Sequence, residues 1–253
     1  DVDPRLFASV AQPIHQFPAA ARGQTMHPAA RVTRIVEIRD KGKGQVEAFR
    51  QPIERGAGMG SQEIDKRLPP RPTSLPREVI DAETGLTPAP VALTAVSLGW
   101  HGNGLLLAAG WRMDDLHRLP LPGLEPRGAL IADLSGPNDP LRVVATHLGL
   151  RRRDRQRQMT QIMAALNLRA DMPTVLLGDL NEWAPHEGFA PLDPFFTVHA
   201  PGRSFHARRL VAALDRVATG PGIAVSDMGT CRSGEAGPAS DHLPIWADLR
   251  VAD

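Results

Sequence analysis

Two polar side chains follow an apolar run in the sequence. The run Pro173–Leu177 ends at Gly178, and Asp179 and Asn181 come directly after it. Valine and leucine between a proline and a glycine are typical of a strand buried on both faces in an α/β sheet. Residues two apart on extended backbone point to the same side, so this carboxylate and carboxamide suit a divalent cation and a water or phosphate oxygen. A plain turn is the alternative, because both residue types are common in turns.

Other acidic and histidine side chains also lie at the edges of apolar segments, where strand ends gather side chains into one crevice. With the two residues above, the set is Glu63, His147, Asp179, Asn181, Asp215, Asp241 and His242. Oxygen ligands without a cysteine cluster suit magnesium or manganese. A histidine oriented by a carboxylate is a competent general base, and a metal beside it offsets charge on a phosphoryl transition state. Each histidine alone is more often an ordinary packed or surface residue, so the set carries the argument.

Asp241 and His242 are adjacent in the sequence. On a regular strand their side chains would point to opposite faces. Both can therefore enter one site only if the backbone is irregular there.

The elements that must position these residues follow from local patterns. We expect a turn and strand over Trp100–Leu107, and a hairpin of Gly128–Leu134 with Leu141–Leu148. Helical spacing of the apolar residues 159–166 predicts a helix that leads back to the strand at Val175. The last third reads as strand ends at 213–217 and 239–249.

The first hundred residues are harder to interpret. We expect a strand at Leu6–Val10 that ends near His15, and helical composition over Arg31–Arg50. The proline-rich residues 67–92 predict a long surface loop.

Five arginines gather at the front of the predicted helix, namely Arg151, Arg152, Arg153, Arg155 and Arg157. A helix dipole disfavours cations at this end, so a phosphate could hold them. A solvated basic face is the alternative.

Composition bounds the answer for the whole chain. The 253 residues, 42% of them hydrophobic, suffice for one large domain over 1–253. A net charge of +1 gives the chain no overall electrostatic attraction to nucleic acid. An aromatic content of 4% without tyrosine makes no base-stacking platform evident. The single Cys231 excludes an intramolecular disulfide. No membrane-spanning run or signal peptide is recognised, although a removed leader stays open because the sequence starts at Asp1. We expect a cytoplasmic monomer, with a periplasmic or secreted location as the alternative.

Four motifs together resemble the endonuclease/exonuclease/phosphatase superfamily. They are Thr146–Leu148, Gly178–Glu182, Leu214–Val217 and Ser240–Pro244, in this order. Upstream, Gln62–Asp65 is similar to the family's Gln-Glu motif, and Trp100–Leu106 to its Tyr-Gly-Asn-type segment. Glu125–Gly128 and Ser204–Arg208 resemble an uncharacterised bacterial branch of metal-dependent hydrolases. The resemblance covers roughly residues 60–250.

The resemblance implies a four-layer α/β sandwich of the DNase I-like type, with two mixed sheets face to face and helices outside. His242 would be the base or transition-state partner, oriented by Asp241. Asp215 would support the histidine or a second metal position.

The resemblance also implies roles for the remaining site residues. Asp179 would activate or position the attacking water, Asn181 would hold a phosphate oxygen or the metal, and His147 would bind the phosphate. Magnesium or manganese would be held by Glu63, Asp179, Asn181 and Asp241. The substrate contacts would be Asn103, Arg127 and Arg208.

The sequence departs from the family near its start. Family members open with a strand that ends in a Tyr-Asn-Ile-like segment, whose asparagine helps to place the metal-bound water. The nearest match is Gln12–His15, with Pro13 in place of the asparagine. Weaker metal binding is the expected consequence.

Two functions remain. The first is a metal-dependent phosphoesterase that hydrolyses phosphodiesters, with DNA, RNA, phospholipid head groups and small diesters all open as substrates. The second is a non-catalytic relative that only binds phosphorylated ligands in the cleft. Turnover of a generic phosphodiester with magnesium or manganese separates them.

Overall fold

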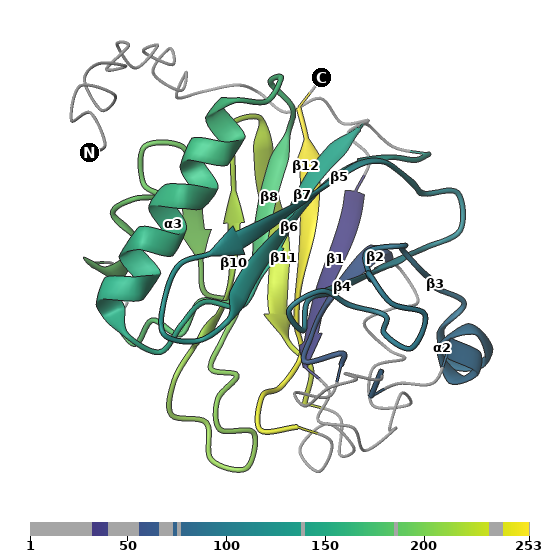
Figure 1. Ribbon diagram of the computed structural model, residues 1–253, viewed down its shortest axis with the longest axis horizontal. Coiled ribbons are helices and arrows are strands. Elements are labelled where there is room, and N and C mark those ends of the chain that lie inside the picture. The colour runs from purple at the N-terminus through teal and green to yellow at the C-terminus, as the bar shows by residue number, and fades with distance from the viewer. Residues whose placement is uncertain are drawn as a thin grey trace, which may run out of the picture.

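A computed structural model shows two β-sheets and one long helix (Figure 1). The residues it describes are 32–39, 56–65, 73–74, 77–137, 140–184, 187–232 and 240–252. The predicted strand at Leu6–Val10 lies outside them, as does Pro13.

The first sheet has the strand order β11-β12-β1-β2-β4-β3. Its strands are β1 (Val32–Arg39), β2 (Gly56–Gln62), β3 (Thr87–Pro88), β4 (Gly104–Leu107), β11 (Ile223–Thr230) and β12 (Ile245–Val251). β1 and β2 are parallel, and the other neighbours are antiparallel. The prediction of a helix over Arg31–Arg50 is therefore wrong for Val32–Arg39. This segment is rich in β-branched residues, which favour strands, and it finds partners on both sides in β2 and β12.

The second sheet has the order β5-β6-β7-β8-β10-β9. Its strands are β5 (Arg112–Leu121), β6 (Arg127–Ser135), β7 (Leu141–Thr146), β8 (Thr174–Asp179), β9 (Thr197–His199) and β10 (Asp215–Thr219). Here β7 and β8 are the parallel pair, in the same position as β1 and β2 in the first sheet. The predicted hairpin of β6 and β7 is confirmed, and so is the strand β8, which is buried along its whole length.

The two sheets pack face to face through one apolar core. Leu105 and Ala247 of the first sheet belong to the same cluster as Leu130 and Leu177 of the second. Gly60 of β2 lies against Leu177 of β8, because a Cβ at Gly60 would be 2.8 Å from that side chain. β2 and β8 therefore contact each other across the sandwich. The contact lies shortly before the predicted site residues Glu63, after β2, and Asp179, at the end of β8.

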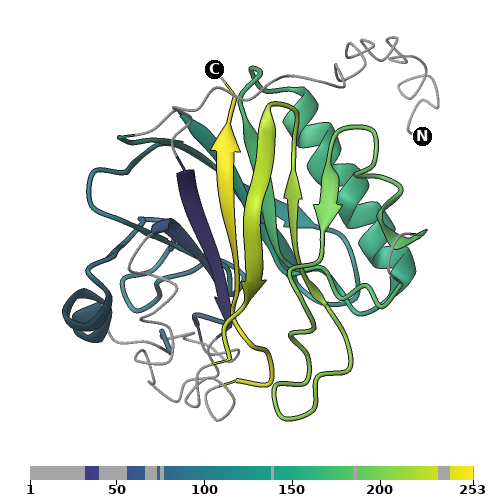
Figure 2. The same cartoon turned by 180° about the vertical axis from the view of Figure 1, so that it is seen from behind.

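The helix α3 (Arg152–Asn167) covers the outer face of the second sheet (Figures 1 and 2). Its apolar residues Met159 and Ile162 share a core with Val144 and Leu176. The predicted helix is therefore confirmed. The helix η3 (Glu187–Phe189) also contributes to this core through Phe189.

The predicted loop 67–92 contains regular structure. The helix α2 (Arg77–Thr84) and the strand β3 lie within it, with α2 beside β3 at the sheet edge (Figure 1). The loop prediction is wrong for these residues, because composition does not show that β4 offers β3 a partner.

The architecture confirms an α/β fold with two mixed sheets. A second outer helix layer, which would complete four layers, stays a prediction, as does the single domain over 1–253. No helix in the described part of the chain has the length and hydropathy of a membrane-spanning segment.

The packing of α3 against the sheet gives the first prediction. Ile162→Ala removes a side chain that is 0% exposed, and it should lower the free energy of unfolding by about 2–5 kcal/mol through lost burial and a cavity. Leu168→Ala, at a position 90% exposed just after the same helix, is the matched control and should change it by less than about 0.5 kcal/mol. Urea unfolding of both variants measures the difference, and equal losses would contradict this packing.

Candidate active site

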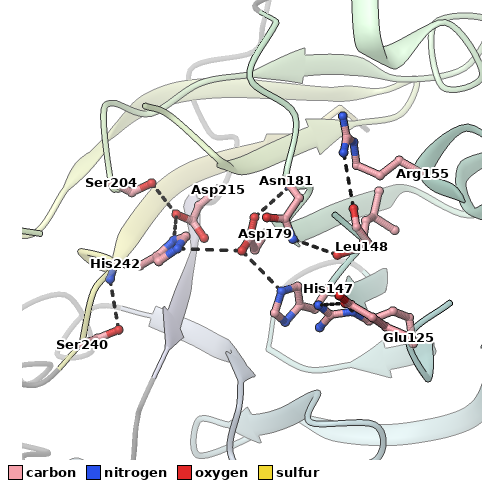
Figure 3. A network of polar contacts seen from close by, with 12 residues as sticks. Glu125, His147, Leu148, Arg155, Asp179, Asn181, Ser204, Asp215, Ser240 and His242 are labelled. Carbon is pink, nitrogen blue, oxygen red and sulfur yellow. Dashed lines mark hydrogen bonds and ion pairs between the residues drawn. The ribbon is translucent and has the colours of Figure 1, made fainter. Parts of the chain in front are cut away.

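Most of the predicted catalytic residues meet where the inner strands of the second sheet end or begin (Figure 3). Asp179 at the end of β8 and Asp215 at the start of β10 are directly opposed partners. His147 follows β7, the parallel neighbour of β8, and the next backbone amide, Leu148 N, donates to Asp179 O at 3.0 Å. Strand register therefore brings residues far apart in the sequence to one place.

His242 is oriented by a carboxylate. Its Nδ1 lies 2.7 Å from Asp215 Oδ2, and the Ser204 hydroxyl donates to the same oxygen. The prediction that Asp241 orients His242 is wrong, because Asp215 holds the ring nitrogen. Asp215 was expected to support the histidine side, and the geometry agrees with that role.

The backbone around His242 is irregular, although Asp241 does not join His242 in the buried cluster. β12 begins only at Ile245, and His242 makes an isolated bridge to Phe205. Its backbone amide donates to Ser240 Oγ at 3.1 Å. This irregular stretch brings the His242 ring in from the first sheet toward the second.

Asp179 lies between the two histidines (Figure 3). Its Oδ2 is 3.4 Å from His147 Nε2 and 3.9 Å from His242 Nε2. Its Oδ1 accepts the backbone amide of Asn181 at 2.8 Å. One buried carboxylate is thus flanked by two imidazoles, one of which is fixed by a second carboxylate.

Asn181 is locked in place by the loop after β7. Its Nδ2 donates to Leu148 O at 2.8 Å, and its φ is 51°, a left-handed value that asparagine tolerates better than most residues. The two loops that follow β7 and β8 are therefore tied together at the site.

The residues present fit a divalent cation. Ligand atoms of Asp179, Asp215 and His242 all lie within 4.8 Å of one another, and all three side chains are buried. Two buried carboxylates this close are costly unless positive charge compensates them.

The predicted metal ligands are only partly brought together. Asp179 belongs to this cluster, Asn181 lies beside it, and Asp241 and Glu63 are not in it. Glu63 follows β2 with a left-handed φ of 54°, and Ile64 N donates to Gly102 O at 3.2 Å. Strained backbone of this kind clusters at functional sites, so Glu63 stays a predicted ligand.

Two of the three predicted substrate contacts have partners within the protein. Asn103 is fully buried and its Nδ2 donates to Gly128 O at 3.0 Å. Arg127 pairs with Glu125 at 2.5 Å. Arg208 is exposed on the loop after Phe205. As placed, Asn103 and Arg127 support the chain around the site, and their contact with substrate stays a prediction.

A buried ion pair beneath the site was missed by the sequence interpretation. Arg155 of α3, one of the five gathered arginines, is 5% exposed and its Nη2 lies 2.8 Å from Glu182 Oε2. Its Nη1 donates to Leu150 O at 2.6 Å. Arg155 therefore holds both loops that carry site residues. It is structural, whereas Arg151, Arg152, Arg153 and Arg157 are exposed.

The ion pair with Arg155 affects the pKa of Glu182. Burial raises the pKa of Glu182, but the hydrogen bonds from Arg155 and from the backbone of Ala184 outweigh it, so the pKa is below its ordinary value. Glu182 is the last residue of the predicted Gly178–Glu182 motif, and only its spacing to the helix arginines could have suggested the pair.

The chain is similar to known proteins in part of its sequence and in its fold. No protein-family model matches the chain. It is similar to the Escherichia coli K12 protein called "Uncharacterized protein YbhP", with 29% identity over 167 residues, 60% of this chain and 64% of the relative. The match thus spans less than two thirds of that relative's length.

Solved structures identify the fold. The TM-score is 0.68 to an endonuclease/exonuclease/phosphatase family protein from Bacteroides thetaiotaomicron, at 12% identity over 88% of this chain and 99% of the other. It is 0.64 to D. rerio TDP2 complexed with single-strand DNA product (12% identity, 87% and 99% covered). It is 0.65 to a B. thetaiotaomicron mannosyl-6-phosphatase (13% identity, 86% and 99% covered). The chain has the endonuclease/exonuclease/phosphatase fold, and the resemblance carried by its motifs is confirmed at that level.

The lowered pKa of Glu182 gives a second prediction. Its folded-state pKa lies below the unfolded value of about 4.3, so its contribution to stability is present above that pH and is lost as the pH falls through the folded pKa. Glu182→Gln should therefore destabilise the protein at pH 7, and the gap to the unchanged protein should narrow as the pH falls below about 4. Melting temperatures from pH 3 to 7 measure this.

The exposed Glu187→Gln is the control for that titration. It lies in η3, close to the same loop, and should leave the melting temperature unchanged at every pH. A gap for Glu182→Gln that is the same at all pH values would show that its charge does not stabilise the fold.

Proposed function

We propose that this protein is a divalent-metal-dependent phosphoesterase that hydrolyses phosphodiester bonds. The observation that carries the proposal is Asp179 held between His147 and His242, with Asp215 fixing His242 from behind. The fold supports it, because neighbours with this fold include a phosphatase and a protein complexed with a DNA product.

The side chains have complementary tasks in this proposal. Asp215 accepts the Nδ1 proton of His242, so Nε2 is the nitrogen that faces Asp179 and the substrate. Asp179 orients the attacking water, Nε2 of the neutral His242 ring takes its proton, and His147 donates to a phosphoryl oxygen. Water adds to phosphorus, the bond to the leaving oxygen breaks, and that oxygen is protonated from solvent.

The metal would be held by Asp179 and Asn181, together with Glu63 from β2 and with Asp241 as a further predicted ligand. Magnesium or manganese suits these oxygen donors, and when bound it would offset the charge of the phosphoryl group.

A diester suits this site better than a monoester. A diester carries one negative charge, whereas a phosphate monoester carries close to two at neutral pH. Two buried carboxylates already lie in the site, so the smaller charge meets less repulsion.

The alternative is a non-catalytic relative that binds phosphorylated ligands in the same place. The departure of the sequence from the family pattern near its start, with Pro13 in place of the asparagine, is the feature that favours it. Hydrolysis of bis-p-nitrophenyl phosphate with magnesium or manganese, and its loss with EDTA, separates the two.

The third prediction concerns the pair of His242 and Asp215. His242→Ala should reduce turnover of bis-p-nitrophenyl phosphate about a hundredfold or more. Asp215→Asn should also reduce it, because it removes the charge that fixes the His242 tautomer. Asp241→Asn should have a smaller effect than Asp215→Asn, since Asp215 holds Nδ1.

The control for this series is His199→Ala. His199 is half-buried and contacts Thr219 in the β9–β10 pair, outside the site. Rates per folded molecule and melting temperatures are measured on all four variants. A preserved rate with a large loss of stability in His242→Ala would remove His242 from the mechanism.

The fourth prediction concerns the exposed arginines before and within the first turn of α3. Changing Arg151, Arg152 and Arg153 together to glutamine should raise the Michaelis constant for a long nucleic acid and flatten its salt dependence, because fewer phosphates are neutralised. The Michaelis constant for a small phosphodiester should stay unchanged. Equal effects on both substrates, or none, would mean that the arginines form only a solvated face.

A further inference from the structure

An exposed tryptophan borders the proposed site. The side chain of Trp183 is 63% exposed, whereas Asn181 and Glu182, which precede it, are buried. Leaving an indole in water forgoes the stabilisation that its burial would give. The indole is therefore accessible to a ligand, and its surroundings decide whether it has a role.

The backbone that carries Trp183 is anchored on both sides. Glu182 pairs with Arg155, and the backbone amide of Ala184 donates to Glu182 Oε1 at 3.0 Å. Asn181 is held by Leu148 O. The position of the tryptophan is thus fixed by the loop, and a ligand that meets the indole pays little to order it.

Trp183 connects to the reacting groups through Phe205. The Trp183 and Phe205 ring centroids are 6.1 Å apart at an interplanar angle of 79°, an edge-to-face contact. The Phe205 and His242 centroids are 5.0 Å apart. The Phe205 ring therefore lies between the indole and the His242 ring, and Trp183 borders the site that holds His242.

We propose that Trp183 is a stacking platform for a nucleobase that the phosphodiester substrate carries. This rests on the proposed function, because it names the substrate class of the same site. Stacking of bases on aromatic side chains tolerates any base sequence, since every base presents a π-face.

The surroundings favour a nucleotide over a lipid. The Phe205 loop also carries the exposed Arg203, Arg208 and Arg209, which suit further phosphates. A lipid substrate would need a contiguous apolar surface of several hundred Å². Among the other large apolar side chains exposed in the described part of the chain, Leu150 and Val211 lie on the loops next to Trp183 and Phe205, whereas Leu93, Val96, Leu124, Leu168 and Met228 lie on other segments.

The test compares two substrates that differ only in their bases. Trp183→Ala should raise the Michaelis constant for the dinucleotide thymidylyl-thymidine about tenfold, the lower part of the range for lost base stacking. It should leave the Michaelis constant for the doubly abasic analogue and both turnover numbers unchanged. Trp183→Phe should restore most of the loss, and Leu124→Ala, an exposed apolar control, should have no effect.

A binding measurement keeps this proposal separate from the proposed function. The methyl ester of thymidine 5′-monophosphate, a phosphodiester with one base, should quench the tryptophan fluorescence saturably, and Trp183→Ala should abolish the quenching. If the unchanged protein hydrolyses neither dinucleotide but shows this quenching, catalysis fails and the platform stands. The platform is overturned if saturable quenching is missing in the unchanged protein or persists in the variant. It is also overturned if Trp183→Ala affects both substrates equally, or weakens hydrolysis of a short-chain phosphodiester lipid alone.

Discussion

The register between β8 and β10 sets the position of the two buried carboxylates around which the site is built. It places Asp179 and Asp215 directly opposite each other where β8 ends and β10 begins. The parallel pairing of β7 with β8 then brings His147 beside Asp179, and Asp215 fixes His242. A slip of one residue would turn these side chains to the other face of the sheet, and the site would be lost.

Burying two carboxylates here requires compensation from the rest of the molecule. Hydrogen bonds supply part of it, because Ser204 and His242 bond Asp215 and the Asn181 amide bonds Asp179. Arg216, the residue after Asp215, is buried as well. Burial lowers the pKa of its guanidinium, whereas the nearby carboxylates, that of Asp215 foremost, raise this pKa. A bound divalent cation would supply charge at the same place, which links the metal to the stability of the site.

The outer helix does more than cover the sheet. Arg155 of α3 donates to Leu150 O in the loop after β7 and pairs with Glu182 in the loop after β8. The loop that carries Asn181 also carries Trp183, so the same ion pair positions a site residue and the exposed indole. The loops that follow β7 and β8 are in this way held together by one buried arginine.

The sequence by itself determined the strand β8, the β6–β7 hairpin and the helix α3, because burial and helical spacing leave local patterns. It also singled out Asp179, Asp215 and His242, which the structure brings together, and their catalytic roles stay predictions. It misplaced β1 as a helix, since that strand is defined by partners distant in the chain. Only the tertiary structure decided that Asp215, and not the adjacent Asp241, orients His242. Only it showed Trp183 beside the site despite a low aromatic content. Composition counts residues, and neighbours in space depend on how the two sheets pack.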